Sequence, residues 1–165
     1  MVLIVNQLLL TLFESVDDQI GHQVDEVRHQ GGLVPSQKEI FRIVGQTALL
    51  VASLPFDVTG TIDLDLTHTA PYAVTQLISK KCLDIGLVLE TDQHLIWMPD
   101  DTIYHAFFTG THISVVVAAP LYVIASKCKF KRLKDKRLIE TYFQHFPNHQ
   151  QTINHMGIST SWINH

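Results

Sequence analysis

Apolar residues recur along the chain at two spacings, and each spacing predicts a different backbone structure. Between residues 3 and 27 they lie three or four positions apart, which is the period of a helix buried along one side. Gly31 and Gly32 end this pattern. The first element is therefore predicted to be a long amphipathic helix, and Gly21 is the position at which it would break.

Extended segments follow this helix and alternate with shorter helical ones. Strands are predicted in "EIFRIVG" (39–45), "GTIDLDLT" (60–67) and "THISVVVAAP" (111–120), because their apolar or β-branched residues fit the strand period. Two short strands are predicted in "GLVLETDQHLIWMP" (86–99), around a turn at Thr91, Asp92 and Gln93. The predicted helices are residues 46–54, 70–86, 120–130 and 133–143.

This order of elements predicts an α/β (α+β) fold, with a small mixed sheet and helices packed on one face. A length of 165 residues fits a single domain. The polar tail either extends loosely or docks on the body through Ile158, Trp162 and Ile163. The expected parts of the domain 1–165 are an N-terminal helix (1–30), a core (40–143) and the tail (147–165).

Charge and cysteine content narrow the class of protein. The net charge of −4 gives no overall attraction to nucleic acid or acidic lipid, so only a local patch could bind a polyanion. Cys82 and Cys128 have neither metal-ligand nor redox spacing, which favours a reduced, cytoplasmic protein. The apolar segment 1–13 is too short to cross a bilayer and lacks a basic leader, so we expect no membrane partner.

The candidate chemistry lies in "FRIVGQTALLVASLPFDVTGTIDLDL" (41–66), where two acids stand one residue apart. In a strand, Asp63 and Asp65 would project side by side, about 7 Å apart at Cα. Ile62, Leu64 and Leu66 would then face the core. Two like charges so close repel unless a cation lies between them, and Mg²⁺ prefers such oxygen ligands. The alternative is a solvated strand edge that binds nothing.

Gly45 stands between a predicted strand and a predicted helix, where backbone N–H groups are free at the helix start. Such a helix start binds phosphate, and glycine allows a close approach. The Thr47 hydroxyl would add a donor. The stretch is therefore predicted to combine a phosphate-binding helix start with a metal-binding pair of acids.

The same stretch resembles a known family of enzymes. A strand, a glycine, a helix and then Thr-x-Asp-x-Asp is similar to the nucleotidyltransferase fold of the DNA polymerase β superfamily, in particular its bacterial branch of AbiEii-type toxins and related nucleotidyltransferase-like proteins. "VVVAAPLYVIASKCKFKRLKDKRLIETYF" (115–143) resembles the strand, Leu-rich helix, Lys-Asp pair and final helix of that branch. The resemblance covers residues 40–143.

The resemblance implies roles for residues of both segments. Asp63 and Asp65 would be the catalytic acids and would chelate two magnesium ions, while a nucleotidyl group is transferred and pyrophosphate leaves. Lys127 matches the family lysine on the helix after the last strand, and Asp135 matches the acid of the Lys-Asp pair. The residues expected to bind the nucleotide are Gly45, Gln46, Thr47 and Lys127.

The chain departs from the family pattern at three places. Gln46 stands where relatives have glycine or serine, and its side chain would crowd the phosphates. Thr59 stands where many relatives have an arginine, which removes a phosphate clamp. The strand 111–120 offers a histidine, a serine and a valine on one face, but no third carboxylate. The nearby alternatives, interpreted as turn residues, are Glu90, Asp92, Asp100 and Asp101.

Other clusters leave two interpretations open. Seven of the twelve basic residues lie between Lys127 and Arg137, either as a site for phosphate or RNA or as a solvated helix surface. The ten histidines form no zinc motif, and His68 would line the cleft mouth or cap its strand. Four aromatic residues would stack on a base or pack in the core, namely Trp97, Tyr104, Phe107 and Phe108.

We therefore predict a nucleotidyltransferase-like protein that binds an NTP with magnesium and transfers a nucleotidyl group to a protein, RNA or small-molecule acceptor. The two acids favour this function. The missing third carboxylate and Gln46 favour an alternative, a catalytically degenerate binding or regulatory module, for example of a toxin–antitoxin pair. A third interpretation is an interaction protein whose acids form a solvated edge.

Overall fold

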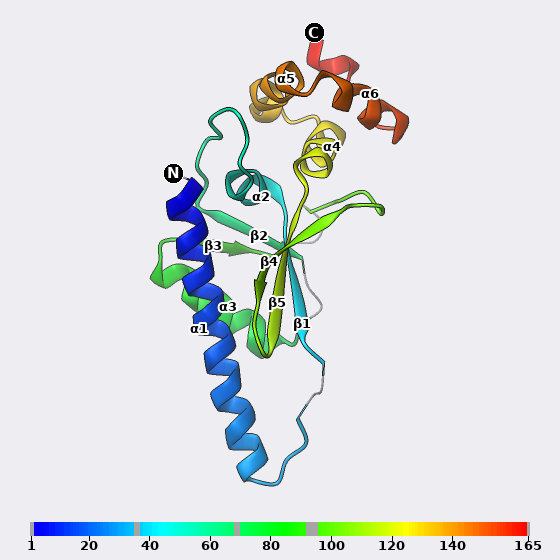
Figure 1. Ribbon diagram of the computed structural model, residues 1–165. Helices are drawn as coiled ribbons and strands as arrows, with labels where there is room; N and C mark the ends of the chain where they lie inside the picture. Colours follow the sequence, from blue (N-terminus) through cyan, green and yellow to red (C-terminus); the bar gives the residue numbers. More distant parts are fainter. Residues whose placement is uncertain (1, 35–36, 68–69, 92–95, 165) are drawn as a thin grey trace.

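A mixed sheet in the order β3-β2-β1-β5-β4 organises the part of the chain that the computed structural model describes, residues 2–34, 37–67, 70–91 and 96–164 (Figure 1). β1 pairs in parallel with β5 and antiparallel with β2, β2 pairs in parallel with β3, and β4 pairs antiparallel with β5. The strands are β1 (Glu39–Ile43), β2 (Asp63–Thr67), β3 (Val88–Glu90), β4 (Tyr104–Thr109) and β5 (Ile113–Ala118). The helices are α1 (Val2–His29), α2 (Gly45–Val51), α3 (Tyr72–Asp84), α4 (Pro120–Phe130), η1 (Leu133–Asp135), α5 (Lys136–His145), α6 (Pro147–His155) and η2 (Ser161–Asn164). This architecture confirms the predicted mixed α/β fold.

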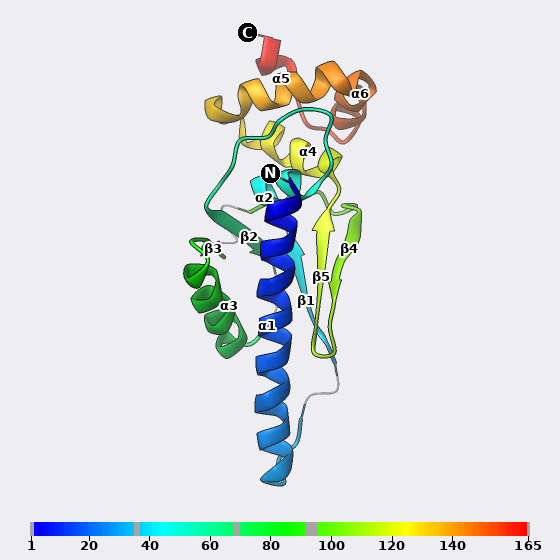
Figure 2. The same cartoon turned by 60° about the vertical axis from the view of Figure 1, so that its left-hand side comes forward.

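One face of the sheet is apolar and covered by helices. Ile43 of β1 and Leu66 of β2 are cross-strand partners and are fully buried on this face, as is Leu64. α1 contacts α2, α3 and β4, and Figures 1 and 2 show it running along the length of the sheet. The opposite face of β2 carries Asp63 and Asp65. The sheet thus separates the core from the two acids.

The first helix is continuous, so the predicted break at Gly21 is wrong. A side chain at this position would place its Cβ 3.2 Å from Nε2 of His112, so α1 passes close to the turn before β5 here. Helical spacing correctly predicted the buried side, which includes Leu9 and Phe13. Within the described residues, neither this helix nor any other is long and apolar enough to cross a membrane.

The fourth strand lies later in the chain than the sequence pattern predicts. Residues 96–99 do not form a strand, and β4 occupies residues 104–109 instead. A bulge between Ala106 and Phe108 breaks the alternation that marks a strand. Both Phe107 and Phe108 therefore pack on Phe13 of α1, in the core. The predicted turn at 91–93 lies partly outside the described residues.

The last three α-helices gather at one end of the sheet, beyond the end of β5 (Figures 1 and 2). The polar tail forms α6 and η2, and the side chains of Ile153, Ile158 and Ile163 are buried. Residues 147–164 are therefore docked on the rest of the molecule, which is one of the two arrangements that the sequence left open, and they do not form a loose extension. α5 also contacts α4, α6 and both 3-10 helices, which makes this end a packed helical unit.

Candidate functional site

Asp63 and Asp65 project from the open face of β2, as the strand period predicts. Asp63 is exposed and Asp65 is half-buried. Among the residues that the structure describes, neither carboxylate accepts a hydrogen bond or forms an ion pair. The expectation that Ile62 faces the core is wrong, since the strand begins only at Asp63 and Ile62 is 63% exposed. The acids therefore form a polar edge with unused ligand atoms.

Gly45 is the first residue of α2 and lies directly against Asp65. Its φ of +62° is in the left-handed region, and a Cβ there would lie 1.9 Å from Oδ2 of Asp65. Any other residue would displace the carboxylate or the helix start. The glycine and the second acid of the predicted motif therefore form one packed unit.

The two residues after this glycine are held by hydrogen bonds within the fold. Thr47 is buried, and its hydroxyl donates to the backbone carbonyl of Asp63 at 2.8 Å. The donor expected for a phosphate is therefore engaged by the strand, and Thr47 fixes α2 to β2. Nε2 of Gln46 donates to the carbonyl of Thr59 at 3.0 Å, and Gln46 lines the cleft described below.

A third carboxylate comes from the neighbouring strand. Glu90 pairs in parallel register with Asp65, and residues in register project from the same face of a sheet. The interpretation of Glu90 as a turn residue is therefore wrong: it is the last residue of β3. Asp100 and Asp101 do lie in a turn, and Asp92 lies outside the described residues.

Two cations are held together on the other side of the site. Lys127 of α4 is buried, and its Nζ donates to Oδ1 of Asp135 at 2.8 Å. Nε of Arg132 donates to Oδ2 of the same carboxylate at 2.8 Å, while the Arg132 side chain stays 47% exposed. Asp135 is buried, so this single acid fixes the positions of both cations.

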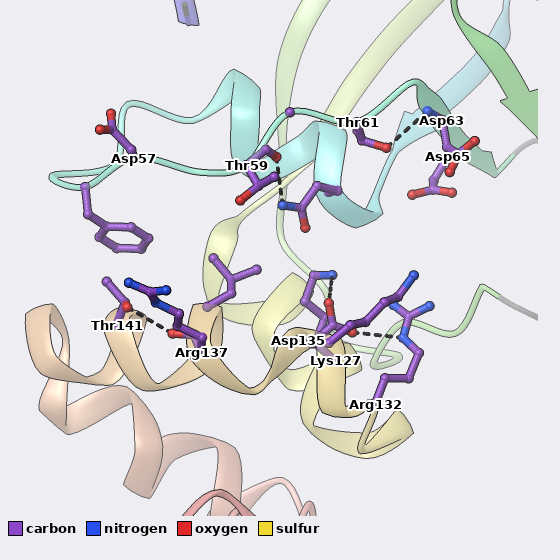
Figure 3. Close-up of a pocket in the computed structure, with 15 residues that line it drawn as sticks. Asp57, Thr59, Thr61, Asp63, Asp65, Lys127, Arg132, Asp135, Arg137 and Thr141 are labelled. Carbon is purple, nitrogen blue, oxygen red and sulfur yellow. Dashed lines mark hydrogen bonds and ion pairs between the residues drawn. The ribbon is translucent and has the colours of Figure 1, made fainter.

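A cleft of about 710 Å³ lies between the acids and these cations (Figure 3). One wall is β2 with the loop 52–62, and the other consists of α4, η1 and α5. Asp63 and Asp65 lie on the first wall, while Lys127 and Arg132 extend from the opposite one. At the far end Phe56 of the loop packs on the rings of Tyr142 and His145. We call this space the large lobe.

A smaller cavity of about 190 Å³ adjoins the large lobe, and we call it the small lobe. Asp63, Asp65, Lys127 and Arg132 line both spaces, so the acids and the cations lie where the lobes meet. The residues that line only the small lobe include Glu90, Ile96, Trp97, Met98, Val123 and Phe130.

The electrostatics of the acids and the cations are linked. Burial raises the pKa of Asp65 to about 6, and the negative charge of Asp63 adds to this effect. The nearby Lys127 opposes it, and Glu90 reinforces it. Burial also lowers the pKa of Lys127, and the hydrogen bond to Asp135 opposes that shift. Crowded negative charge is therefore costly here, and a bound cation would relieve that cost.

The acids fit the ligand preferences of magnesium. Among the described residues, no three His, Cys, Asp or Glu side chains are grouped closely enough to hold a metal ion alone. Mg²⁺ typically takes one or two protein carboxylates and completes its shell with water and phosphate oxygens. Asp63 and Asp65 meet this requirement, with Glu90 beside them. His145 and His149 instead hydrogen-bond to Thr141 and Tyr142.

The basic residues between Lys127 and Arg137 do not all have the same surroundings, since some line the cleft and others lie elsewhere. The four aromatic residues likewise divide between a cavity wall and the core. Lys134 and Arg137 line the large lobe together with the two held cations, whereas Nζ of Lys129 lies 3.7 Å from the centroid of the Trp97 ring. Trp97 lines the small lobe, in contrast to the two phenylalanines in the core. His68, considered for the cleft mouth, lies outside the described residues.

Comparisons of this chain with protein-family models, curated proteins and solved structures gave no significant match. The resemblance to nucleotidyltransferases therefore rests on the sequence motifs described above and stays a prediction.

Proposed function

We propose that the chain is a nucleotidyltransferase that binds a nucleoside triphosphate with magnesium and transfers the nucleotidyl group to an acceptor hydroxyl. The observation that carries this proposal is the meeting of two opposite charge sets in one cleft. Asp63 and Asp65, whose carboxylates have no partner among the described residues, suit a divalent cation, and Lys127 and Arg132 suit phosphate oxygens. A magnesium–triphosphate complex requires both sets at once.

Each set has a defined task in this proposal. Asp63 and Asp65 hold the metal, which neutralises charge on the phosphates when bound. Glu90 adds a third negative charge beside Asp65 and strengthens the attraction for a divalent cation. The strand 111–120 has no third acid, but Glu90 of β3 provides one beside Asp65. A third acid next to the metal site supports transfer activity.

The cations bind and orient the triphosphate. Asp135 engages Nε of Arg132, which leaves the outer N–H groups of the guanidinium for phosphate oxygens. Arg132, which immediately precedes η1, therefore provides the phosphate clamp that Thr59 cannot provide. Lys127 contributes a second positive charge at the junction of the lobes.

A degenerate binding or regulatory module, for example of a toxin–antitoxin pair, remains the second candidate. Gln46 favours it, since this side chain is tied to Thr59 and lines the cleft near the acids. Such a module would bind the magnesium–nucleotide complex without turnover.

Calorimetric titration with ATP, GTP, CTP and UTP in the presence of Mg²⁺ tests nucleotide binding. We expect at least one to bind, and Asp63→Ala and Asp65→Ala to reduce its affinity at least tenfold by removing metal ligands. Asp100→Ala is the matched control, since this exposed acid lies in a turn and lines neither lobe. If no nucleotide binds the unaltered protein, the proposal fails.

Turnover distinguishes the two candidates. A nucleotide radiolabelled at the α-phosphate is incubated with the protein and with total RNA or cell protein, and both pyrophosphate release and label transfer are measured. Label transfer that Glu90→Gln slows strongly supports the enzyme. Tight binding with neither signal supports the degenerate module.

A further inference from the structure

We propose that the small lobe holds the nucleobase of the bound nucleotide, while the large lobe holds the phosphates and admits the acceptor. This inference rests on the proposed function and specifies how the nucleotide is oriented in the site. It assigns a ligand subsite to Ile96, Trp97, Met98 and Phe130, to which the resemblance gives no role.

The sizes of the lobes support this division. Pockets that enclose a whole drug-sized ligand have volumes of roughly 300–1,000 Å³. The large lobe, at about 710 Å³, falls within this range. The small lobe, at about 190 Å³, is large enough only for part of such a ligand. Because the lobes share the acids and the cations, one nucleotide can extend from the large lobe into the small one.

The chemistry of the walls points the same way. Ile96, Trp97, Met98 and Phe130 give the small lobe an aromatic and aliphatic wall, which suits the faces of a planar base. The large lobe is lined by Lys134 and Arg137 in addition to the shared cations, and also by several hydroxyl groups. Phosphate groups are stabilised there, and an apolar ring is not.

Trp97 is held in place before any ligand binds. The Ser126 hydroxyl donates to its backbone carbonyl at 2.5 Å, and Nζ of Lys129 lies 3.7 Å from its ring centroid. A ring fixed in this way loses little conformational freedom when a base packs against it. The indole is therefore a preformed wall of the lobe.

The opposite end of the large lobe is a poorer site for the base. Its aromatic residue, Phe56, already packs on Tyr142 and His145, at centroid distances of 6.4 and 5.0 Å. Its other neighbours include Asp57 and Thr141, which are polar. This end is better suited to a polar acceptor.

Calorimetry with two probes tests the assignment. The tightest-binding nucleotide and inorganic triphosphate are each titrated, with Mg²⁺, into the unaltered protein, Trp97→Ala and Phe130→Ala. We expect both variants to bind the nucleotide about tenfold or more weakly and Trp97→Ala to bind inorganic triphosphate unchanged. The Phe130 ring also lies 5.9 Å from Cζ of Arg132, so Phe130→Ala should lose some affinity for inorganic triphosphate, but less than for the nucleotide. Phe130 is 37% exposed at the end of α4, so Phe130→Ala decides the question if Trp97→Ala fails to fold.

The outcomes separate this inference from the proposed function. Binding of neither probe to the unaltered protein overturns both. Nucleotide affinity that survives both substitutions overturns the base assignment and leaves the proposed function standing. An equal loss for both probes also overturns it, because the side chains would then support the phosphate site rather than contact a base.

Fluorescence gives an independent readout. The chain has two tryptophans, so in Trp162→Phe all tryptophan emission comes from Trp97. We expect the nucleotide to change this emission at saturation, and inorganic triphosphate to change it much less. Equal changes with the two probes would contradict contact between the base and the indole.

Discussion

Asp17 and Asp65 are two acids that the fold treats in opposite ways. Each lies against a glycine: a Cβ on Gly110 would lie 2.4 Å from Cγ of Asp17, and one on Gly45 would lie 1.9 Å from Oδ2 of Asp65. The Asp17 carboxylate accepts hydrogen bonds from three backbone N–H groups, those of residues 111, 112 and 113, at 3.0, 2.7 and 2.9 Å. Asp65 has no such donor among the described residues.

The pKa values of the two acids follow this difference. Burial raises the pKa of Asp17, but the backbone hydrogen bonds, led by that from His112, outweigh it and hold the pKa below the ordinary value. Burial raises the pKa of Asp65 to about 6, and Asp63 raises it further. A carboxylate whose bonds are completed within the fold stabilises it, whereas one left with free oxygens is positioned for a ligand.

The largest expected change in stability comes from removing the Asp17 carboxylate, which accepts three backbone hydrogen bonds. Asp17→Ala leaves three backbone N–H groups without their charged acceptor, so we expect the free energy of unfolding to fall by about 3 kcal/mol. Urea unfolding measures this change. Asp18→Asn is the control, because Asp18 is exposed on the same turn of α1 and should change stability little. Equal effects of the two substitutions would contradict the assigned role of Asp17.

The next largest change in stability is expected from a substitution at the contact between Gly45 and Asp65. Gly45→Ala adds a Cβ against Asp65 at a positive φ, so we expect a loss of about 2 kcal/mol in unfolding free energy. In the Asp65→Ala background the contacts with Oδ2 and Cγ disappear, while the backbone strain and a 3.1 Å approach to Cβ of residue 65 remain, so the loss should fall to about 1 kcal/mol. A double-mutant cycle measures the difference. Full additivity would show that the two residues do not interact.

A smaller effect, of opposite sign to that at Asp17, is expected at Asp65. Asp65→Asn removes a half-buried charge next to Asp63, so without divalent metal we expect the unfolding free energy to rise by about 1 kcal/mol. The same substitution should weaken magnesium-dependent nucleotide binding, because it removes a charged metal ligand. Loss of stability comparable to that of Asp17→Ala would remove the distinction between the two acids.

The last effect is a pair of opposite pH dependences. The folded protein takes up a proton at Asp65 near pH 6, whereas the unfolded chain does so near 3.8, so this acid makes stability rise as pH falls through that window. The pKa of Asp17 is lowered, so its contribution is complete above 3.8 and is lost as pH falls through the folded pKa. Urea unfolding is measured across pH without divalent metal. The part of the pH dependence of the unfolding free energy that comes from Asp65 should be absent in Asp65→Asn, and the part that comes from Asp17 should be absent in Asp17→Asn.

The sequence predicted the elements whose periodicity is undisturbed. The buried side of α1 and the alternation of β2 both repeat over enough residues to identify a helix and a strand. β4 was missed because its bulge places Phe107 and Phe108 on the same side. β3 is only three residues long, so the position of Glu90 opposite Asp65 had no periodic signal.

The cationic half of the site was predicted only in part, since it depends on tertiary geometry. Lys131 adopts a left-handed conformation, with φ of +52°, immediately after α4. The chain turns there, which brings Arg132 and Asp135 back toward Lys127. A basic run alone does not show which of its members turn inward.

The pairing of β1 with β5 has a consequence for the order in which the protein can fold. β1 lies between β2 and β5, and its parallel neighbour is made only after three further strands have been synthesised. The carboxylate oxygens of Asp17 likewise accept hydrogen bonds only from backbone N–H groups 94 to 96 residues downstream, which are synthesised much later. Contacts this distant slow folding. On the ribosome, the acids of β2 emerge long before the strand that completes their sheet and the helix that carries Lys127, so the cleft is assembled late in synthesis.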